Sequence, residues 1–358
     1  MTVAALDLRA ALREQFAFDH FHPGQEEVIR RILGGEDTLA ILATGAGKSL
    51  CYQLPALLLD GTTLVVSPLI ALMKDQIDML RERGFTNVVA LNSTLSEDQE
   101  ALAMKRIASG GMKIVFVTPE KLEDDAFVTI LRSLTVPLFV VDEAHCISAW
   151  GHDFRPAYLN LGRVITQLGD PTVLALTATA TPAVREDILI QLGIPNVKPI
   201  VKGFDRPNLR YEVRRADSES AKLKALKELF ETGLDGTGII YTATIKNALE
   251  VQHYLHDVMD LPAAVYHSKL QKHDRVSVHE LFMQEAIRAV VATNAFGLGI
   301  DKANIRFVVH YDLPGSVEAY TQEAGRAGRD GDLSRCILLY RMSDTRRKLR
   351  RVRQLLAR

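Results

Sequence analysis

The sequence predicts an α/β protein with two tandem lobes, each a mostly parallel sheet with helices on both faces. Short apolar runs of strand length alternate with amphipathic helical segments along residues 38–192. The pattern lapses over 196–220, which contains Pro199, Pro207 and a charged stretch, and then resumes up to residue 340. Such alternation is typical of a parallel sheet covered by helices. A length of 358 residues allows two domains.

The elements follow one another in a regular order. Strands of the first lobe are expected at 38–43, 62–67, 88–91, 112–118, 138–142 and 172–177. Helices between them include 69–83, 97–107 and 182–192. Strands of the second lobe are expected at 238–241, 263–266, 289–293, 306–310 and 336–340. The predicted organisation is a first lobe over 1–203, a linker over 204–216, a second lobe over 217–340 and a basic amphipathic tail over 341–358.

Composition excludes several classes of protein. The fractions of hydrophobic (47%) and charged (24%) residues are ordinary for a soluble globular protein, and no apolar run approaches the ~18 residues of a membrane span. The N-terminal segment carries acids at helical periodicity, so we expect no signal peptide. Cys51, Cys146 and Cys336 lie far apart. We therefore expect no disulfide framework, no zinc and a cytoplasmic location, associated with the nucleoid if the source is bacterial.

The tail has a charge opposite to that of the rest of the chain. Residues 341–358 contain eight Lys or Arg and one Asp, a balance of +7, so the preceding residues sum to −8 within a net charge of −1. A basic end on a mildly acidic body can indicate nucleic-acid binding. The alternative is a solvated helix face. Leu349, Val352, Leu355 and Leu356 recur at helical spacing, which predicts an apolar stripe that is either packed on the second lobe or left exposed.

A candidate phosphate-binding loop follows the first strand. The loop and the helix start after it supply Thr44, Gly45, Ala46, Gly47, Lys48 and Ser49. A strand, a glycine-rich turn and a helix start direct backbone amides at an anion. We expect Lys48 to contact the β and γ phosphates of a nucleotide and the Ser49 hydroxyl to bind Mg²⁺. The GxxxxGK[ST] pattern fails at its first position, Leu42, so an ordinary strand–turn–helix is the alternative.

Charged pairs in both lobes complete a site for phosphoryl transfer. Asp142 and Glu143 directly follow an apolar strand, where Asp142 can bind the same Mg²⁺ as Ser49 and Glu143 can deprotonate a water. Arg326 and Arg329 are three residues apart, on one face if helical, and can stabilise the γ-phosphate in the transition state. The alternatives are a surface loop for the acids and salt-bridged surface arginines.

These residues resemble the motifs of the RecQ helicases of superfamily two over residues 16–340. The most specific segment is 142–158, DEAHCISAWGHDFRPAY, which is similar to the family's Walker B motif joined to its aromatic-rich loop. FHPGQ resembles the adenine-reading motif, and SPLIALMKDQ, TPE, LTATAT, VATNAFGLGID and QEAGRAGRDG resemble the remaining motifs in order. The resemblance implies two RecA-like lobes and an ATP-dependent 3′–5′ DNA helicase that acts in DNA repair or recombination.

The resemblance also implies roles for single residues. Gln25 would read adenine, since its amide can both donate and accept, with Phe18 as a stacking face and Gln322 near the nucleotide. Single-stranded or partially duplex DNA would contact both lobes. The candidate DNA-binding residues are Ser67, Thr118, Trp150, Phe154, Arg155 and Thr293. For Trp150, the only tryptophan, core packing is the alternative.

Four departures from the family pattern bear on these expectations. His22 stands in place of Arg, Ala43 and Ala46 replace Pro and Gly in the phosphate loop, and Ala149 replaces Gln in the aromatic loop. Alanine at position 46 requires a negative φ. The sequence ends at Arg358, where the family continues into zinc-binding and winged-helix domains, so we expect a short form or a helicase core.

Two other functions stay open. An RNA helicase of the DEAD/DEAH kind shares the phosphate and acid motifs, although the aromatic loop argues against it. A nucleic-acid clamp with little unwinding would keep the binding residues without the motor. For the helicase we expect ATP and Mg²⁺ as cofactors, a monomeric state and no membrane partner.

Overall fold

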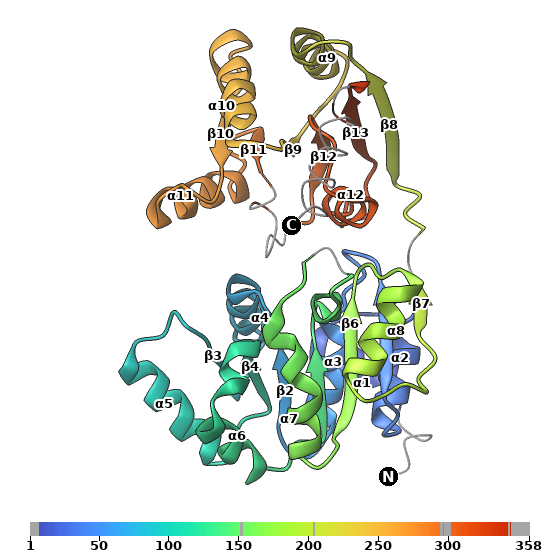
Figure 1. Ribbon diagram of the computed structural model, residues 1–358, viewed down its shortest axis with the longest axis vertical. Coiled ribbons are helices and arrows are strands. Elements are labelled where there is room, and N and C mark those ends of the chain that lie inside the picture. Colours follow the sequence, from blue (N-terminus) through green and yellow to red (C-terminus); the bar gives the residue numbers. More distant parts are fainter. Residues whose placement is uncertain are drawn as a thin grey trace, which may run out of the picture. The chain divides into compact units, whose positions relative to one another are not determined.

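The computed structural model describes residues 7–150, 153–202, 205–293, 296, 302–342 and 344. The chain forms two compact units, Met1–Phe204 and Asp205–Arg358, each built around its own sheet (Figure 1). Most of the expected basic tail, residues 345–358, lies outside the described residues. No helix in the described ranges is long and apolar enough to cross a membrane.

The first unit is built on a parallel sheet with strand order β3-β4-β2-β5-β6-β1-β7. Its strands are β1 (Thr38–Leu42), β2 (Thr63–Val66), β3 (Val88–Leu91), β4 (Ile114–Val117), β5 (Leu138–Val141), β6 (Thr172–Thr177) and β7 (Ile200–Lys202). The six strands expected from the sequence are confirmed, and β7 is an additional edge strand. Because all paired strands run in one direction, their carboxyl ends lie along one edge of the sheet.

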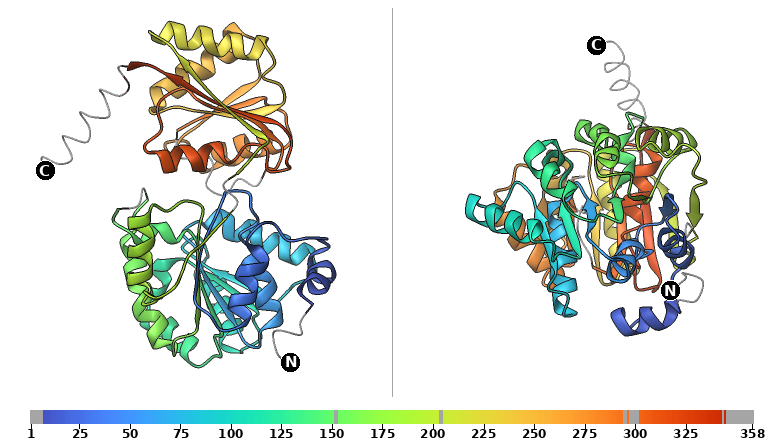
Figure 2. Two further views of the ribbon diagram at one scale, coloured as in Figure 1. Left: turned by 90° about the vertical axis from the view of Figure 1, so that its right-hand side faces the viewer. Right: turned by 90° about the horizontal axis from the view of Figure 1, so that it is seen from below.

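Helices cover both faces of this sheet, as the left view of Figure 2 shows. The helices are α1 (Leu8–Phe16), α2 (Gln25–Leu33), α3 (Leu50–Leu58), α4 (Ile70–Glu82), α5 (Glu97–Ala108), α6 (Asp125–Arg132), α7 (Leu161–Gln167) and α8 (Pro182–Gln191). Short 3-10 turns are η2 (Pro119–Glu123), η3 (Ala144–Ile147) and η4 (Pro156–Asn160). Side-chain caps mark several starts: in α5, for example, Ser96 and Gln99 form a reciprocal capping box.

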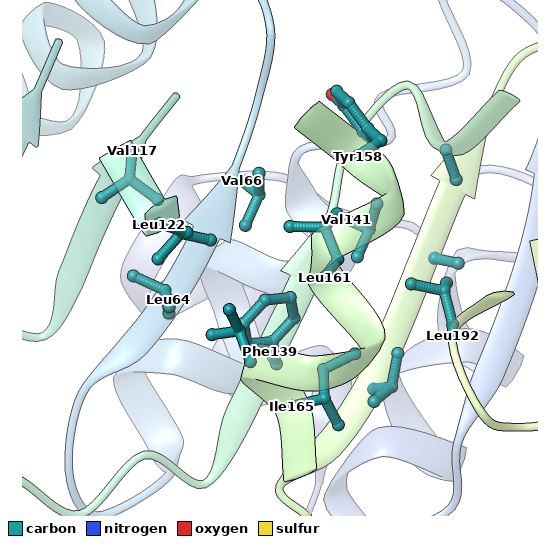
Figure 3. Close-up of a cluster of buried hydrophobic side chains, with 14 of the residues drawn as sticks. Leu64, Val66, Val117, Leu122, Phe139, Val141, Tyr158, Leu161, Ile165 and Leu192 are labelled. Atoms are coloured by element: carbon teal, nitrogen blue, oxygen red, sulfur yellow. The ribbon is translucent and has the colours of Figure 1, made fainter. Parts of the chain in front are cut away.

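Alternate residues of each strand enter two separate cores. In β1, Leu39 and Ile41 join one core with helices α5 to α8, whereas Ala40 and Leu42 join the other with α1 to α4. Figure 3 shows part of the first core, where Phe139 and Val141 of β5 lie near side chains of α7. Both faces of the strands are apolar, which is why the sequence shows continuous hydrophobic runs rather than alternation.

The second unit contains a parallel sheet of order β10-β11-β9-β12-β13-β8. Its strands are β8 (Leu209–Arg215), β9 (Thr237–Tyr241), β10 (Ala263–Tyr266), β11 (Ala289–Ala292), β12 (Ile305–His310) and β13 (Ser334–Tyr340). Its helices are α9 (Glu219–Glu231), α10 (Ile245–His253), the π-helical turn η5 (Tyr254–Val258), α11 (Lys272–Met283) and α12 (Val317–Ala324). Residues of α9 and α10 pack on one face, and residues of α11 and α12 pack on the other.

The structure differs from the linker expected over 204–216. Residues 209–215 form β8, which pairs in parallel with β13 along its whole length. The strand lies at the sheet edge, and its side chains Tyr211 and Val213 are 56% and 66% exposed. Charged residues between these exposed positions give the segment a loop-like composition, which concealed an edge strand.

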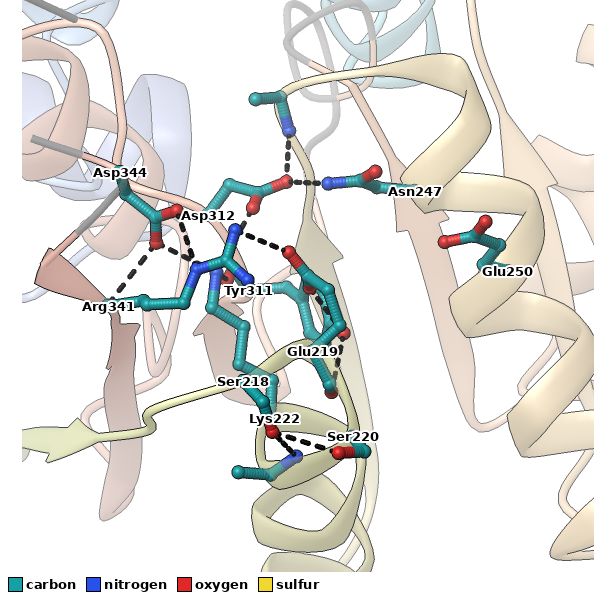
Figure 4. A network of polar contacts seen from close by, with 12 residues as sticks. Ser218, Glu219, Ser220, Lys222, Asn247, Glu250, Tyr311, Asp312, Arg341 and Asp344 are labelled. Carbon is teal, nitrogen blue, oxygen red and sulfur yellow. Dashed lines mark hydrogen bonds and ion pairs between the residues drawn. The ribbon is translucent and has the colours of Figure 1, made fainter. Parts of the chain in front are cut away.

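A buried ion-pair network connects four parts of the second unit (Figure 4). The fully buried Lys222 Nζ lies 2.9 Å from Asp344 Oδ2 and 3.2 Å from Asp312 Oδ1. Asp312 Oδ2 in turn accepts hydrogen bonds from Ala243 N at 2.8 Å and Asn247 Nδ2 at 2.7 Å. The network therefore joins α9, the end of β12, the start of α10 and the segment after β13.

Candidate active site

The phosphate loop follows β1 in a conformation that depends on its two glycines. Gly45 and Gly47 have φ angles of 83° and 65°, in the left-handed region that favours glycine. Ala46 is outside the set of described residues with positive φ, so the condition for alanine at this position is met. Lys48 Nζ lies 3.4 Å from the Leu42 carbonyl, and α3 begins two residues later. The loop thus places Lys48 directly before the N-terminus of α3.

Gln25 connects the phosphate loop to α2. Its buried side-chain amide donates to the carbonyls of Ala46 at 3.0 Å and Gly47 at 2.9 Å. Its oxygen accepts from His22 N at 2.8 Å. A Cβ at position 47 would lie 2.6 Å from Gln25 Nε2, so glycine is required there for space as well as for φ. The residue expected to read adenine is therefore in contact with the loop expected to bind phosphate.

Asp142 is a buried carboxylate at the end of β5. Its Oδ1 accepts from Glu143 N at 3.0 Å and its Oδ2 accepts from the Ser67 hydroxyl at 3.2 Å. Burial, with a further contribution from Glu143, raises the pKa of Asp142 to about 6, although Lys48 acts in the opposite direction. Strands β1 and β5 both pair in parallel with β6, so Lys48 after β1 and Asp142 after β5 follow the same edge of the sheet. An acid pair and a lysine meet at one sheet edge.

Glu143 has an unusual backbone and a histidine partner. Its φ of 48° is in the left-handed region, which is rare for a residue with a long side chain. Its Oε2 lies 3.3 Å from Nδ1 of the buried His145, which is also 3.0 Å from the Thr177 hydroxyl at the end of β6. Tyr158 donates its hydroxyl to the Asp142 carbonyl at 3.0 Å. These contacts fix the acid turn between two strands.

The residue types at the end of β5 and at the start of α3 suit a hard divalent cation. Mg²⁺ prefers carboxylate and hydroxyl oxygens, which Asp142 and Ser49 offer. The raised pKa of Asp142 fits such a site, because a cation favours the ionised carboxylate that burial disfavours. We therefore retain these two residues as the candidate Mg²⁺ ligands.

Ser67 is not placed as expected for a DNA contact. Its side chain is 3% exposed and its hydroxyl donates to Asp142. The end of β2 lies beside the end of β5, so Ser67 faces the acid pair rather than an open surface. Thr118, at the end of β4, is 8% exposed, and Thr293, at the end of β11, is half-buried. Ser67 is therefore better described as a support for Asp142.

The aromatic loop exposes its rings. Trp150 is 81% exposed and Phe154 is 39% exposed, which rules out core packing for the tryptophan in this structure. Arg155 Nη1 donates to the Pro68 carbonyl at 3.4 Å, and its backbone N donates to Cys146 O at 2.8 Å. The loop is consequently attached to the turn that carries the acid pair. Residues 151 and 152 between the two rings lie outside the described part.

Phe18 also has an exposed ring. It is 44% exposed, stacks on Phe16 with ring centroids 6.4 Å apart, and lies 5.2 Å below the Arg83 guanidinium. One ring face is therefore taken by Arg83. An exposed ring at the entrance to α2 is compatible with stacking on a base.

The two arginines of the second unit are not on a helix face. Helix α12 ends at Ala324, and residues 325–330 form turns with Gly328 at φ 55°. The backbone at Gly328 and the tight packing around it are not helical. The expectation that Arg326 and Arg329 share one helix face is therefore wrong. Arg326 is buried beside Tyr241, whose pKa is raised to about 12 by burial while the guanidinium opposes that shift. Arg329 and Gln322 are half-buried.

Sequence reasoning missed several partners of these residues. His145 and Tyr158 hold the acid turn, and His310, fully buried, pairs with Glu323 at 2.9 Å beneath the arginine turn. The lone histidine at the end of the β12 run was the only signal for His310. No local pattern could have indicated that a residue from an expected linker contacts the arginine turn, as described below.

Comparisons with known proteins agree with this site. The chain matches the family of DEAD/DEAH box helicases over residues 22–188 and the helicase conserved C-terminal domain over residues 221–331. Fold and site together define a two-lobed helicase core. More specifically, the chain belongs to the RecQ family of helicases.

The similarity covers nearly all of this chain. It is 43% identical over 338 residues to the ATP-dependent DNA helicase RecQ of Bacillus subtilis (strain 168), covering 94% of this chain and 56% of the relative. It is 42% identical over 332 residues to the probable ATP-dependent DNA helicase RecS of the same organism, covering 93% and 66%. The Mycobacterium smegmatis helicase Lhr, solved with ssDNA and AMP-PNP, shares the fold with a TM-score of 0.75 at 24% identity, covering 94% of this chain and 48% of that one. The chain thus spans about half to two thirds of the length of these curated relatives.

Proposed function

We propose that this chain hydrolyses ATP on single-stranded DNA and translocates 3′ to 5′, as a helicase of DNA repair or recombination. The observation that supports the proposal is that Lys48 and the pair Asp142 and Glu143 follow the carboxyl ends of β1 and β5, which both pair in parallel with β6. The 43% identity to a named ATP-dependent DNA helicase supports it.

The first unit would bind and activate the nucleotide. Amides of residues 44–49 and of the start of α3 would face the phosphates, and Lys48 would supply positive charge. Gln25 would read adenine, with Phe18 beside the base. A Mg²⁺ held by Ser49 and Asp142 would supply positive charge at the phosphate oxygens.

Glu143 is the proposed general base. It follows directly after Asp142, and its contact with His145 at 3.3 Å restrains its carboxylate. In that position it can orient a water and accept its proton as the γ-phosphate is transferred. Arg326 and Arg329 of the second unit would stabilise charge on the transferred group, with Gln322 nearby. A supply of arginines from a second unit would make hydrolysis depend on the relation between the units, as a motor requires.

The proposed DNA contacts lie at strand ends and in the aromatic loop. Thr118 and Thr293 would donate to phosphates without reading sequence. Trp150 and Phe154 would stack on bases, and Arg155 would add positive charge. The attachment of this loop to the acid turn gives a route by which bound DNA could stimulate hydrolysis. We propose a monomer that binds single-stranded and partially duplex DNA, with the basic tail adding phosphate contacts.

The deciding experiment measures ATP turnover with no nucleic acid, with single-stranded DNA and with single-stranded RNA, followed by strand displacement. We expect DNA to stimulate turnover strongly in the wild type. Lys48→Ala, Glu143→Gln and Arg329→Ala should each lower turnover by orders of magnitude, because each removes a different part of one transition state. Equal stimulation by RNA would favour an RNA helicase, and turnover without displacement would favour a clamp. Turnover in Glu143→Gln close to the wild type would refute the assigned base.

A further inference from the structure

The turn that carries Arg326 and Arg329 is held by side chains from the beginning of the second unit. Arg206 Nη2 donates to the carbonyls of Ala327 at 2.9 Å and Gly328 at 2.7 Å. These two carbonyls lie between the two arginines in the sequence. The contact therefore fixes the backbone on which both guanidinium groups depend.

A second side chain completes this support. Asn208 Nδ2 donates to the carbonyls of Gly328 at 2.8 Å and Asp332 at 3.0 Å. Arg206 Nε lies 3.4 Å from Asn208 Oδ1, so the two side chains also contact each other. On the other side of the turn, Gly328 N donates to Ile305 O at 2.8 Å. The turn is consequently bound on both sides.

The packing at Gly328 leaves little room for displacement. A Cβ at this position would lie 2.6 Å from Asn208 Nδ2 and 2.7 Å from both Asp332 O and Ser334 Oγ. Its φ of 55° also disfavours other residues. The turn and the Arg206–Asn208 segment therefore behave as one packed piece, and a shift of one requires a shift of the other.

This segment is also the point at which the chain enters the second unit. The unit begins at Asp205, Arg206 follows it directly, and Asn208 immediately precedes β8. The carbonyls that these two side chains bind belong to a turn far along the chain: Arg206 and Ala327 are 121 residues apart. Arg206 and Asn208 therefore connect the start of the second unit directly to the turn that carries Arg326 and Arg329.

We propose that Arg206 and Asn208 are positioning residues for Arg326 and Arg329. By holding the backbone of the turn, they would keep both guanidinium groups where they can stabilise the negative charge on the transferred phosphate. The inference rests on the proposed function, since it acts through the arginines assigned there. Positioning matters because a misplacement of about 1 Å can lower turnover about 100-fold.

The test uses two conservative substitutions in the full chain. Asn208→Asp keeps the shape but replaces the donor with an acceptor facing two carbonyls, and Arg206→Lys keeps the charge but loses the fork that reaches two carbonyls. Arg210→Lys, at an exposed position on β8, is the matched control. We measure kcat and KM for ATP at saturating single-stranded DNA, together with the melting temperature.

We expect kcat to fall about tenfold or more in both variants, by the misplacement argument. KM for ATP should stay near the wild-type value, because the residues proposed to bind adenine and the phosphates lie in the first unit and only Gln322, on α12, belongs to the second. The melting temperature of Asn208→Asp should fall, because its carboxylate faces two carbonyls, whereas that of Arg206→Lys should stay closer to that of Arg210→Lys; kcat is therefore measured at a temperature at which every variant is folded. A kcat no lower than that of the control Arg210→Lys overturns the inference. A rise in KM with kcat unchanged overturns it as well.

A double-mutant cycle separates the inference from the proposed function. If Arg206 acts through both arginines, adding Arg206→Lys to a variant that carries Arg326→Ala and Arg329→Ala should leave the kcat of that variant about unchanged. If the fold-reductions in kcat instead multiply, Arg206 acts independently of the arginines. That result overturns the positioning role of Arg206 and leaves the proposed role of the arginines unaffected. An Arg329→Ala variant with unchanged kcat overturns the role proposed for the arginines, and the inference with it.

Discussion

Replacing Asp142 by Asn should make the protein more stable while abolishing its turnover. The buried carboxyl has a pKa raised from 3.8 to about 6. At 1.36 kcal/mol per pKa unit, this shift of about two units corresponds to about 3 kcal/mol of destabilisation at neutral pH. Asparagine has the same shape and can still contact Ser67 and the Glu143 amide, so it removes the charge without removing the contacts.

The gain should appear as a rise in melting temperature of the metal-free and nucleotide-free protein. For a domain of this size, 1 kcal/mol corresponds to about 2–4 °C, so we expect a rise of roughly 6–12 °C at pH 7.5. Asp60→Asn, at an exposed position, is the control and should leave the melting temperature unchanged. Differential scanning fluorimetry or circular dichroism of both variants provides the measurement.

The pH dependence of the gain tests its cause. The raised pKa of Asp142 means that the folded state binds this proton more tightly than the unfolded state. The contribution of the protonated Asp142 carboxyl to the stability of the folded state is therefore complete below pH 3.8, and it is lost as the pH rises through about 6. The advantage of Asp142→Asn should be small near pH 4, grow up to about pH 6 and stay constant above it. A gain of equal size at pH 4 and pH 7.5, or no gain at all, would refute the reasoning.

Three further outcomes are expected. Trp150→Ala should leave the melting temperature unchanged, because the ring is 81% exposed, but should lose DNA stimulation of ATP turnover; a markedly lower melting temperature would contradict the exposed placement. Lys222→Met should lower stability by about 3–5 kcal/mol in chemical denaturation, since it leaves Asp312 buried without its cation and leaves Asp344 only Arg341, 3.6 Å away, whereas Lys224→Met at an exposed site should not. Deleting residues 345–358 should flatten the plot of log affinity for DNA against log salt by about two or more units; an unchanged slope would mean that the tail makes no phosphate contacts.

Much of the fold was predictable because its strands are apolar on both faces. The run at 88–91 and the run at 172–177 coincide with β3 and β6, since their ends are marked by polar residues. Strand β8 was not predicted, because an edge strand with one exposed face has the composition of a loop. The sequence likewise could not indicate that α12 ends before Arg326, since the turn is imposed by carbonyl contacts to Arg206 and Asn208.

The site was predictable to the extent that its residues follow strand ends. Lys48, Asp142 and Glu143 were identified by position, and the structure places lysine and acids within electrostatic reach. Ser67 was assigned to DNA by the same rule, but the rule gives the edge of the sheet and not the direction of a side chain. Its hydrogen bond to Asp142 depends on β2 and β5 being neighbours, which only the strand order reveals.

The left-handed backbone of Glu143 has a consequence for engineering. A conformation of this kind holds about 1–3 kcal/mol of strain in a residue other than glycine. Glycine or asparagine at position 143 would relieve that strain but remove the proposed base. Selection of variants for thermal tolerance alone would thus favour inactive sequences at this turn, a direct conflict between robustness and turnover. Libraries built on this scaffold need a screen for ATP hydrolysis in every round in which heat resistance is improved.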